Sequence, residues 1–334
     1  MMKSYMKIDQ MIEYLKTTKK ILVEKEDVHW LEEINYMNLI HPFKELFSCG
    51  KSKDGTYYYK YFVDLKEYIK VFEIESNFSN ELHKDIRMFE RKFKNIIFDE
   101  LCKEYVGRYN DTYCVRYIDE IERFLNGDKQ VPMFCTNIDK VLTKYGYKDD
   151  FYDLDKRKDV LKKIYLYGSK LKNRSNLLLK QYQDKYEFVP LWIISNVLTL
   201  GEIIMIYSML DIRLQNRIYE RIFDDGFIKN NEVIEFKRLN RFIAKLEYLR
   251  KVRNIISHFT PLFPFILKTS KSKLNQRANI ISLLQLLNPR YNYDQRNIIE
   301  LKEYLNLSIV ISPHNLLHIQ VLLLMIDYLN FKPK

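Results

Sequence analysis

Residues 64–105 read DLKEYIKVFEIESNFSNELHKDIRMFERKFKNIIFDELCKEY, and this stretch decides the fold class. Apolar residues recur along it at steps of three or four: Leu65, Ile69, Phe72, Ile86, Phe89, Phe93, Ile96, Ile97 and Leu101. Because an α-helix turns once every 3.6 residues, this spacing gathers the apolar side chains on one face. The stretch therefore predicts one or two long helices that bury this face.

The chain on either side of this stretch has the same helical periodicity. Further helices are predicted at Ile8–Lys19, around Asp27–Asn35, at Val115–Leu125, from Leu154 to about Tyr186, from about Asn231 to Ser257, at Ala278–Leu287 and at Pro313–Phe331. Only 8 Gly and 8 Pro interrupt the 334 residues, too few for the tight turns of a fold built from many short strands. The sequence thus predicts an all-α protein.

Three segments break the helical pattern. Residues Ile34–Leu39, followed by Pro42, are interpreted as a helix end and a turn. Residues Cys49–Tyr59 form a polar loop around Asp54-Gly55, which suits a hairpin tip, and Lys268–Arg277 is a basic, polar link. The predicted organisation is an N-terminal helical region at 1–60, a helical domain at 61–266 with a peripheral insertion near 107–153, and C-terminal helices at 267–334 that pack on the same body.

The most apolar segment, Leu191–Leu210, carries a single charge at Glu202. It is predicted to be a buried helix opened by Pro190 rather than a membrane span, because it also contains polar residues and lacks a flanking basic asymmetry. Residues Met1–Lys20 lack the unbroken apolar core of an export signal, and the four cysteines form no close pair such as C-x-x-C. We therefore expect a cytoplasmic protein without a disulfide framework, metal site or cofactor.

The charge balance favours a polyanionic partner. The chain has 55 Lys and Arg against 44 Asp and Glu, a formal net charge of +11, which suits phosphate contacts on a nucleic acid. A Lys-rich, AT-biased genome is the alternative explanation of this excess. Basic clusters at Lys170–Arg174 and Lys268–Lys273 are candidate phosphate contacts, although a solvated surface explains them equally well.

The candidate catalytic residues are Arg253, Asn254 and His258, which close the helix predicted up to Ser257 and precede Pro261. This R-x4-H spacing alone is weak, since it occurs by chance in many proteins. On an ideal helix Arg253 and His258 lie about 140° apart around the axis, so a straight helix does not aim both at one atom. Unwinding near His258 or the long reach of the Arg side chain would bring them together.

Several runs accompany the motif along the chain. They are Leu31–Leu39 ending in Ile34-Asn35-Tyr36, the long helix Phe78–Glu104, Val189-Pro190-Leu191-Trp192 followed by Leu200-Gly201, Leu246–Val252 leading into the motif, and Leu262-Phe263 behind it. In this order they resemble the Abi-like abortive-infection family over roughly residues 8–266, and the motif resembles the signature of the HEPN ribonuclease superfamily. Ile256-Ser257 and Lys94 depart from the family pattern, which often has Cys-Ala before the His and an acidic pattern on the long helix.

The resemblance implies an HEPN-like helical bundle with additional N- and C-terminal helices, and an endoribonuclease of antiviral defence. His258 would act as acid and base, Arg253 would contact the phosphate, and Asn254 would orient His258 or the RNA. Since the 2′-OH of RNA is the nucleophile, no metal is required. Two chains would form a composite cleft as a homodimer, which is a third way to complete the site.

RNA is the expected substrate, and the resemblance implies a small noncoding RNA as a further partner that could guide or restrain the protein. The alternative is a helical RNA-binding module in which the motif grips phosphate without cleaving it. A third interpretation is a structural adaptor whose basic charge is incidental. The other histidines, His29, His41, His83, His314 and His318, have no supporting motif, and His314 with His318 is interpreted as part of an ordinary helix face.

Overall fold

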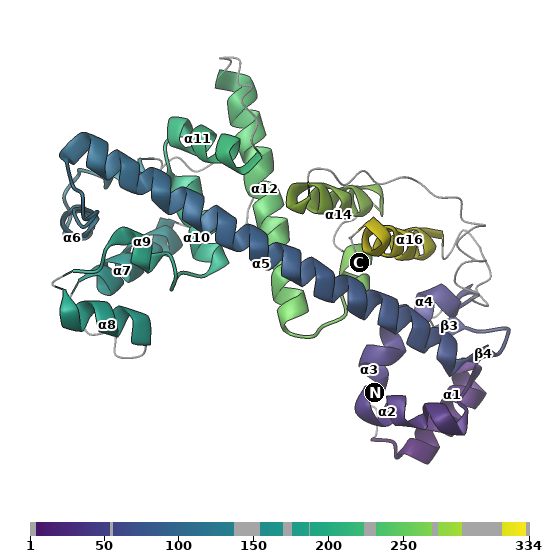
Figure 1. Cartoon of the computed structure of the whole chain (residues 1–334). Coiled ribbons are helices and arrows are strands. Elements are labelled where there is room, and N and C mark those ends of the chain that lie inside the picture. The colour runs from purple at the N-terminus through teal and green to yellow at the C-terminus, as the bar shows by residue number, and fades with distance from the viewer. Residues whose placement is uncertain are drawn as a thin grey trace. The chain divides into compact units, whose positions relative to one another are not determined.

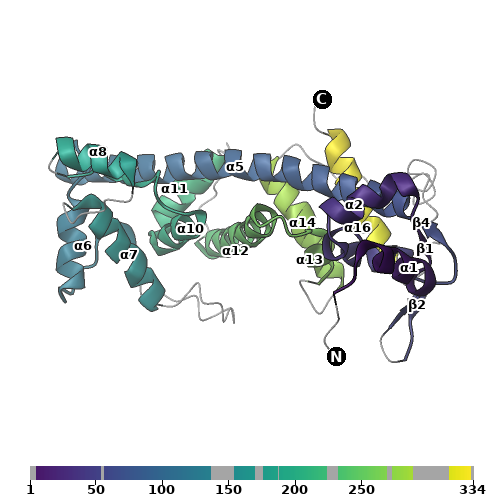
Figure 2. The ribbon, with the colours of Figure 1, turned by 90° about the horizontal axis from the view of Figure 1, so that it is seen from below.

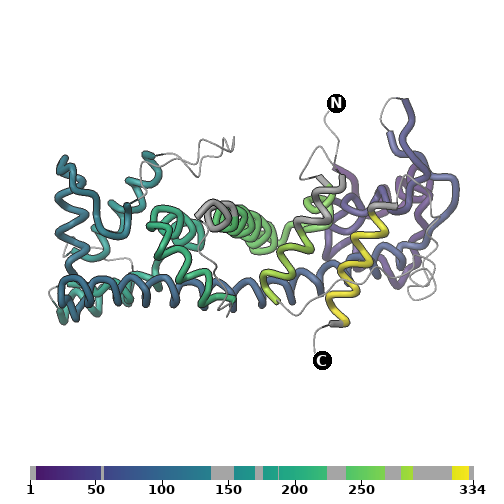
Figure 3. The backbone as a smooth tube through the Cα atoms, turned by 90° about the horizontal axis from the view of Figure 1, so that it is seen from above, coloured from purple at the N-terminus to yellow at the C-terminus, as the bar shows by residue number. Residues whose placement is uncertain are grey.

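The structure, a computed structural model, describes residues 5–53, 56–136, 154–169, 176–186, 188–223, 232–268, 273–288 and 316–331. Figure 3 traces the backbone of the chain. The described residues are mostly helical, as the sequence predicts. The strands found among them are four pairs of residues: β1 (Ile21–Leu22), β2 (Gly50–Lys51), β3 (Tyr57–Tyr58) and β4 (Val63–Asp64). The fold class is therefore all-α.

The chain forms two compact units. One contains residues 1–86 and 251–334, and the other contains residues 87–250. Two helices contribute to both: α5 (Leu65–Tyr109), the long blue helix in Figure 1, and α12 (Glu232–Ser257). The region predicted to form one or two long helices is thus a single helix of 45 residues. The domain boundaries predicted near residues 60 and 266 stay predictions.

The first unit begins with short elements that lead into α5. They are α1 (Ile8–Lys19), a 3₁₀ turn at Lys25–Asp27, α2 (Val28–Glu33), α3 (Tyr36–Leu39), a 3₁₀ turn at His41–Phe43 and α4 (Lys44–Phe47). The interpretation of Ile34–Leu39 as a helix end and turn is wrong for its second half, because the Asn35 side chain accepts the N–H of Asn38 at 3.2 Å and starts a new helix.

The strands of the first unit form two small pairs. Strands β2 and β3 are antiparallel, which confirms the hairpin predicted within Cys49–Tyr59. Strands β1 and β4 are parallel, with Ile21 opposite Val63. The sequence did not predict this second pair, because two residues are too few to show an alternating pattern.

The C-terminal elements of the first unit are α13 (Phe263–Lys268), α14 (Lys273–Leu287) and α16 (Leu316–Phe331), with α13 next to both of the others. Helix α14 starts within the segment Lys268–Arg277, so the prediction of a link through Arg277 is wrong. Buried aromatic rings join these helices to the rest of the unit: Phe263 lies 5.4 Å from Phe43, and Tyr328 lies 5.6 Å from Phe78 of α5.

The second unit contains the remaining elements of the chain. They are α6 (Tyr117–Leu125), a 3₁₀ turn at Met133–Cys135, α7 (Leu154–Gly168), α8 (Leu177–Lys185), α9 (Leu191–Ile194), α10 (Leu200–Met209) and α11 (Ile212–Phe223). Helices α6 and α7 lie side by side, as Figures 1 and 2 show. The core of this unit includes edge-to-face contacts among Phe93, Tyr207 and Phe242, with centroids 5.5–6.1 Å apart.

The apolar segment Leu191–Leu210 is largely buried, as predicted, although Trp192 is exposed, and it forms two helices rather than one. Thr199 interrupts it: its hydroxyl accepts the N–H of Glu202, and the Glu202 carboxylate accepts the N–H of Thr199 at 2.7 Å. This capping box starts α10 and explains the single charge of the segment. No helix in the described part of the chain has the length and apolar character needed to cross a membrane.

Several sequence predictions concern residues outside the described ranges, among them the hairpin tip Asp54-Gly55 and His314. Three larger segments lie there as well. They are the basic cluster Lys170–Arg174, most of the cluster Lys268–Lys273, and the part of the predicted insertion from residue 137 to 153.

Candidate active site

The motif residues lie at the C-terminal end of α12, within the first unit. Arg253 and Asn254 are half-buried on the last turns of the helix, and the Arg253 Nη1 donates to Asn254 Oδ1 at 3.4 Å. Ser257 is the last helical residue, and His258 follows it in an exposed turn. The helix therefore ends before His258, so the 140° separation on an ideal helix does not fix the direction of its side chain.

The backbone of the turn follows a defined helix-ending motif. The N–H of Phe259 donates to the carbonyl of Ile256 at 3.0 Å, and the N–H of Thr260 donates to that of Ile255 at 3.2 Å. This pair of bonds is a Schellman motif, which needs a residue in the left-handed conformation after the helix. Phe259 fills that position, with φ +52°. His258, one residue earlier, is held by its own N–H, which reaches the carbonyl of Asn254 at 3.2 Å.

A buried carboxylate anchors the chain just beyond this turn. Glu75 of α5 is 4% exposed, and its Oε1 accepts the N–H of Leu262 at 2.7 Å and the hydroxyl of Ser79 at 3.1 Å. Burial raises the pKa of Glu75, while the hydrogen bonds from Leu262, Ser79 and the Phe263 backbone oppose the rise. Glu75 therefore holds the backbone in place a few residues after His258.

A second histidine lies near the motif. The Nε2 of His83, on α5, is 3.5 Å from the Oγ of Ser257, the residue before His258. The sequence indicated no role for Glu75 or His83, since their contacts with Leu262 and Ser257 join positions more than 170 residues apart in the chain. No local pattern encodes contacts of that range.

His318 lies on a face of α16 that is buried in the core, a burial that the sequence did not indicate. It is 6% exposed, its Nε2 lies 2.8 Å from the Oε2 of Glu45, and its ring is 6.1 Å from Phe263. The hydrogen bond with His318 is the main cause that holds the pKa of Glu45 well below its usual range. His314 lies outside the described residues, among which no His, Cys, Asp and Glu side chains gather in a set able to hold a metal ion.

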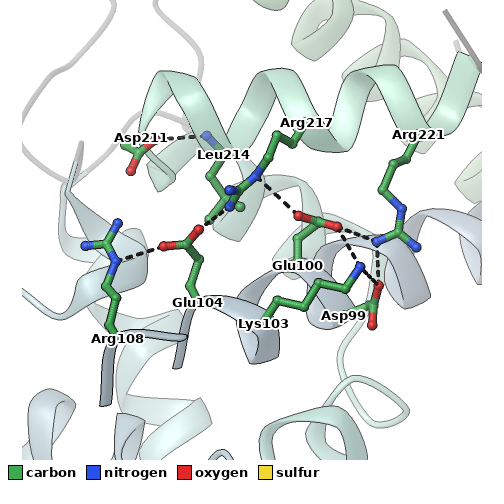
Figure 4. Close-up of polar contacts among 9 residues, drawn as sticks. All are labelled: Asp99, Glu100, Lys103, Glu104, Arg108, Asp211, Leu214, Arg217 and Arg221. Carbon is green, nitrogen blue, oxygen red and sulfur yellow. Dashed lines mark hydrogen bonds and ion pairs between the residues drawn. The ribbon is translucent and has the colours of Figure 1, made fainter. Parts of the chain in front are cut away.

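In the second unit, a charge network attaches α11 to α5 (Figure 4). Glu100, whose side chain is 7% exposed, pairs with Lys103 at 3.1 Å, Arg217 at 3.3 Å and Arg221 at 2.6 Å. Arg217 and Arg221 also contact Glu104 and Asp99, respectively. The positive charges of Arg217 and Arg221 are thus matched by carboxylates of α5, and these ion pairs hold the two helices together.

The end of α12 therefore combines an exposed imidazole, a half-buried guanidinium and an amide. An imidazole exchanges protons near neutral pH, and a guanidinium can donate two parallel hydrogen bonds to phosphate oxygens. These groups suit proton transfer at a phosphate ester. Asn254 connects them, because it accepts from the Arg253 side chain and from the His258 backbone.

Comparisons with known proteins give one result that bears on this site. The model of a family described as "Abi-like protein" matches residues 29–264, which is more than half of the chain and includes the whole motif and Glu75. Comparisons with curated proteins and with solved structures give no match.

Proposed function

Because the chain belongs to the Abi-like protein family, which implies a function related to abortive infection, we propose that it is a metal-independent endoribonuclease of the HEPN type. It would act in the anti-phage defence of bacteria by cutting RNA. The observation that supports this most directly is the ending of α12, where Arg253 and Asn254 on the last turns precede the exposed His258, and where a buried carboxylate holds the chain just beyond the turn. The formal net charge of +11 favours a polyanionic substrate.

Each motif residue has a proposed role in the reaction. A His258 imidazole removes the proton of the 2′-OH, whose oxygen attacks the adjacent phosphorus, and an imidazolium protonates the departing 5′-oxygen. The Arg253 guanidinium stabilises the charge on the non-bridging oxygens. Asn254 orients the guanidinium, to which it is already bonded at 3.4 Å. The products are a 2′,3′-cyclic phosphate and a 5′-OH, and DNA is not cut because it lacks the nucleophile.

The reaction needs a general base and a general acid at the same time. The motif at the end of α12 supplies only one imidazole per chain, that of His258. We therefore propose that two chains form the complete cleft as a homodimer, so that one His258 is the base and the other is the acid. A small noncoding RNA is a further proposed partner, which would restrain the nuclease until infection.

The test is cleavage of a labelled RNA by the purified full-length protein in EDTA. His258→Ala should lower the rate by about 10²- to 10⁴-fold because it removes general acid–base catalysis, and Arg253→Ala by about 10²- to 10³-fold because it removes transition-state stabilisation. The matched controls are His29→Ala and Arg123→Ala, which change exposed residues that are not part of the motif. A parent protein that binds RNA and leaves it intact would favour the non-catalytic RNA-binding module instead.

A further inference from the structure

Phe259, the residue after His258, has the most exposed large hydrophobic side chain among the residues that the structure describes. It is 92% exposed, whereas most phenylalanines in these ranges are buried. A ring exposed in this way contributes almost nothing to the stability of the isolated protein, because hydrophobic stabilisation comes from apolar surface removed from water. The position of this ring therefore calls for an explanation outside the packing of the chain.

The backbone of Phe259 adds a second unfavourable feature. Its φ of +52° lies in the left-handed region, which glycine adopts freely and a bulky residue does not. Glycine is the usual residue at this position of a Schellman motif. A strained residue that gains nothing from burial points to a functional site, because strain of this kind persists where a function needs it.

The position of Phe259 directly after His258 points to a role for its ring in binding the substrate. Consecutive Cα atoms are about 3.8 Å apart, and both side chains are exposed, so a nucleotide next to a phosphate bound at His258 is within reach of the Phe259 ring. Proteins hold the unstacked bases of single strands by stacking them on aromatic rings. A nucleic acid also agrees better with the net charge of +11 than an apolar protein surface does.

We propose that Phe259 stacks on the base beside the scissile phosphate and that the substrate is therefore unpaired RNA. This inference rests on the proposed function, because it takes His258 to contact the phosphate. A phenyl ring has no hydrogen-bonding group, so it can stack on any base but does not distinguish one base from another. Stacking on Phe259 requires a base that is not stacked within an RNA double helix. The ring should therefore strengthen the binding of loops and single strands, but not the binding of a continuous duplex.

The binding test uses His258→Ala as the parent, so that RNA stays intact. Fluorescence anisotropy of a labelled single-stranded RNA is compared for this parent and for the parent with Phe259→Ala, Phe259→Trp or Tyr113→Ala. Loss of the ring should weaken binding by about 5- to 150-fold, the range of one base–aromatic stack. Phe259→Trp should keep the affinity, and Tyr113→Ala, which removes a ring that is 73% exposed elsewhere, should leave it unchanged.

A stability measurement separates this role from a structural one. Phe259→Gly should raise the melting temperature, because glycine relieves the left-handed strain, while it weakens RNA binding as much as Phe259→Ala does. If the ring had a structural role instead, Phe259→Gly would lower both the melting temperature and the RNA affinity. Unchanged RNA affinity in Phe259→Ala would overturn the proposal, and so would a change in sedimentation mass with unchanged affinity, since the ring would then contact a second chain.

The binding and cleavage experiments can refute the stacking proposal and the nuclease proposal independently. If Phe259→Ala weakens binding of single-stranded RNA but not of a duplex of the same sequence, and the parent protein does not cut RNA, Phe259 binds an unpaired base and the nuclease assignment alone is wrong. If the His258-containing protein cuts RNA and Phe259→Ala changes neither KM nor affinity, the nuclease holds and the stacking proposal is wrong.

Discussion

Replacement of Glu75 tests whether a buried carboxylate positions the turn that carries His258. Glu75→Ala removes the acceptor of the Leu262 N–H, a bond of 2.7 Å between buried groups. A buried donor without an acceptor costs about 1–3 kcal/mol, and the space left by the side chain adds to this. We expect Glu75→Ala to lower the free energy of unfolding by about 2–4 kcal/mol.

Glu75→Gln is the matched variant, because it keeps an acceptor oxygen and nearly the same volume. It should cost clearly less than Glu75→Ala, and it should also change the pH dependence. Since the folded pKa of Glu75 is raised above its ordinary value of 4.5, its contribution to stability is present below pH 4.5 and is lost as the pH rises through the folded pKa. Glu75→Gln should lack this loss.

The assay is urea unfolding of the parent and both variants between pH 4.5 and 7, with cleavage measured at a temperature where all remain folded. Glu75→Ala should reduce kcat more than it changes KM, because the turn that holds His258 is displaced while the rest of the RNA contacts remain. Equal stabilities of the Ala and Gln variants, together with a pH slope like that of the parent, would refute this account of Glu75.

Three further predictions concern the fold around the site and the second unit. Glu45→Gln removes the carboxylate that pairs with His318; because the folded pKa of Glu45 is lowered, its stabilisation is present above about pH 4.5 and is lost as the pH falls. Acid unfolding followed by circular dichroism should therefore be less steep for Glu45→Gln below pH 4.5, and a curve parallel to the parent's would contradict this. Thr199→Ala removes the cap of α10 and should cost about 1 kcal/mol in urea unfolding, whereas Thr199→Ser should cost little; equal midpoints for all three proteins would argue against the cap. Gly168→Ala would place a Cβ 2.2 Å from the Tyr117 hydroxyl and should cost about 1–3 kcal/mol, and Tyr117→Phe should relieve part of that cost in the double variant; strictly additive losses would show that the two residues do not clash.

The long helices could be predicted from the sequence because their apolar spacing extends over many turns. Helix α5 ends at Tyr109 rather than near Tyr105, and α12 extends over the predicted region from Glu232, the first described residue there, to Ser257. The short elements were harder. The split in Leu191–Leu210 follows from the T-x-x-E pattern of Thr199 and Glu202, a local signal that the apolar composition of the segment obscured.

Only those residues of the candidate site that are close together in the sequence could be predicted. Arg253, Asn254 and His258 are neighbours in sequence, and the end of α12 at Ser257 agrees with the predicted helix. Glu75 and His83 reach this end through tertiary packing, so no spacing indicates them. The left-handed Phe259 was missed for another reason: glycine signals such a turn, and here a bulky residue adopts it.

The end groups of the RNA fragments test the central claim most directly. The full-length protein would be incubated with an end-labelled RNA in EDTA, and the fragments analysed by mass spectrometry. The proposed role of His258 predicts 2′,3′-cyclic phosphate and 5′-OH ends that are absent with His258→Ala. Fragments with 3′-OH and 5′-phosphate ends, or cleavage that His258→Ala leaves intact, would contradict it.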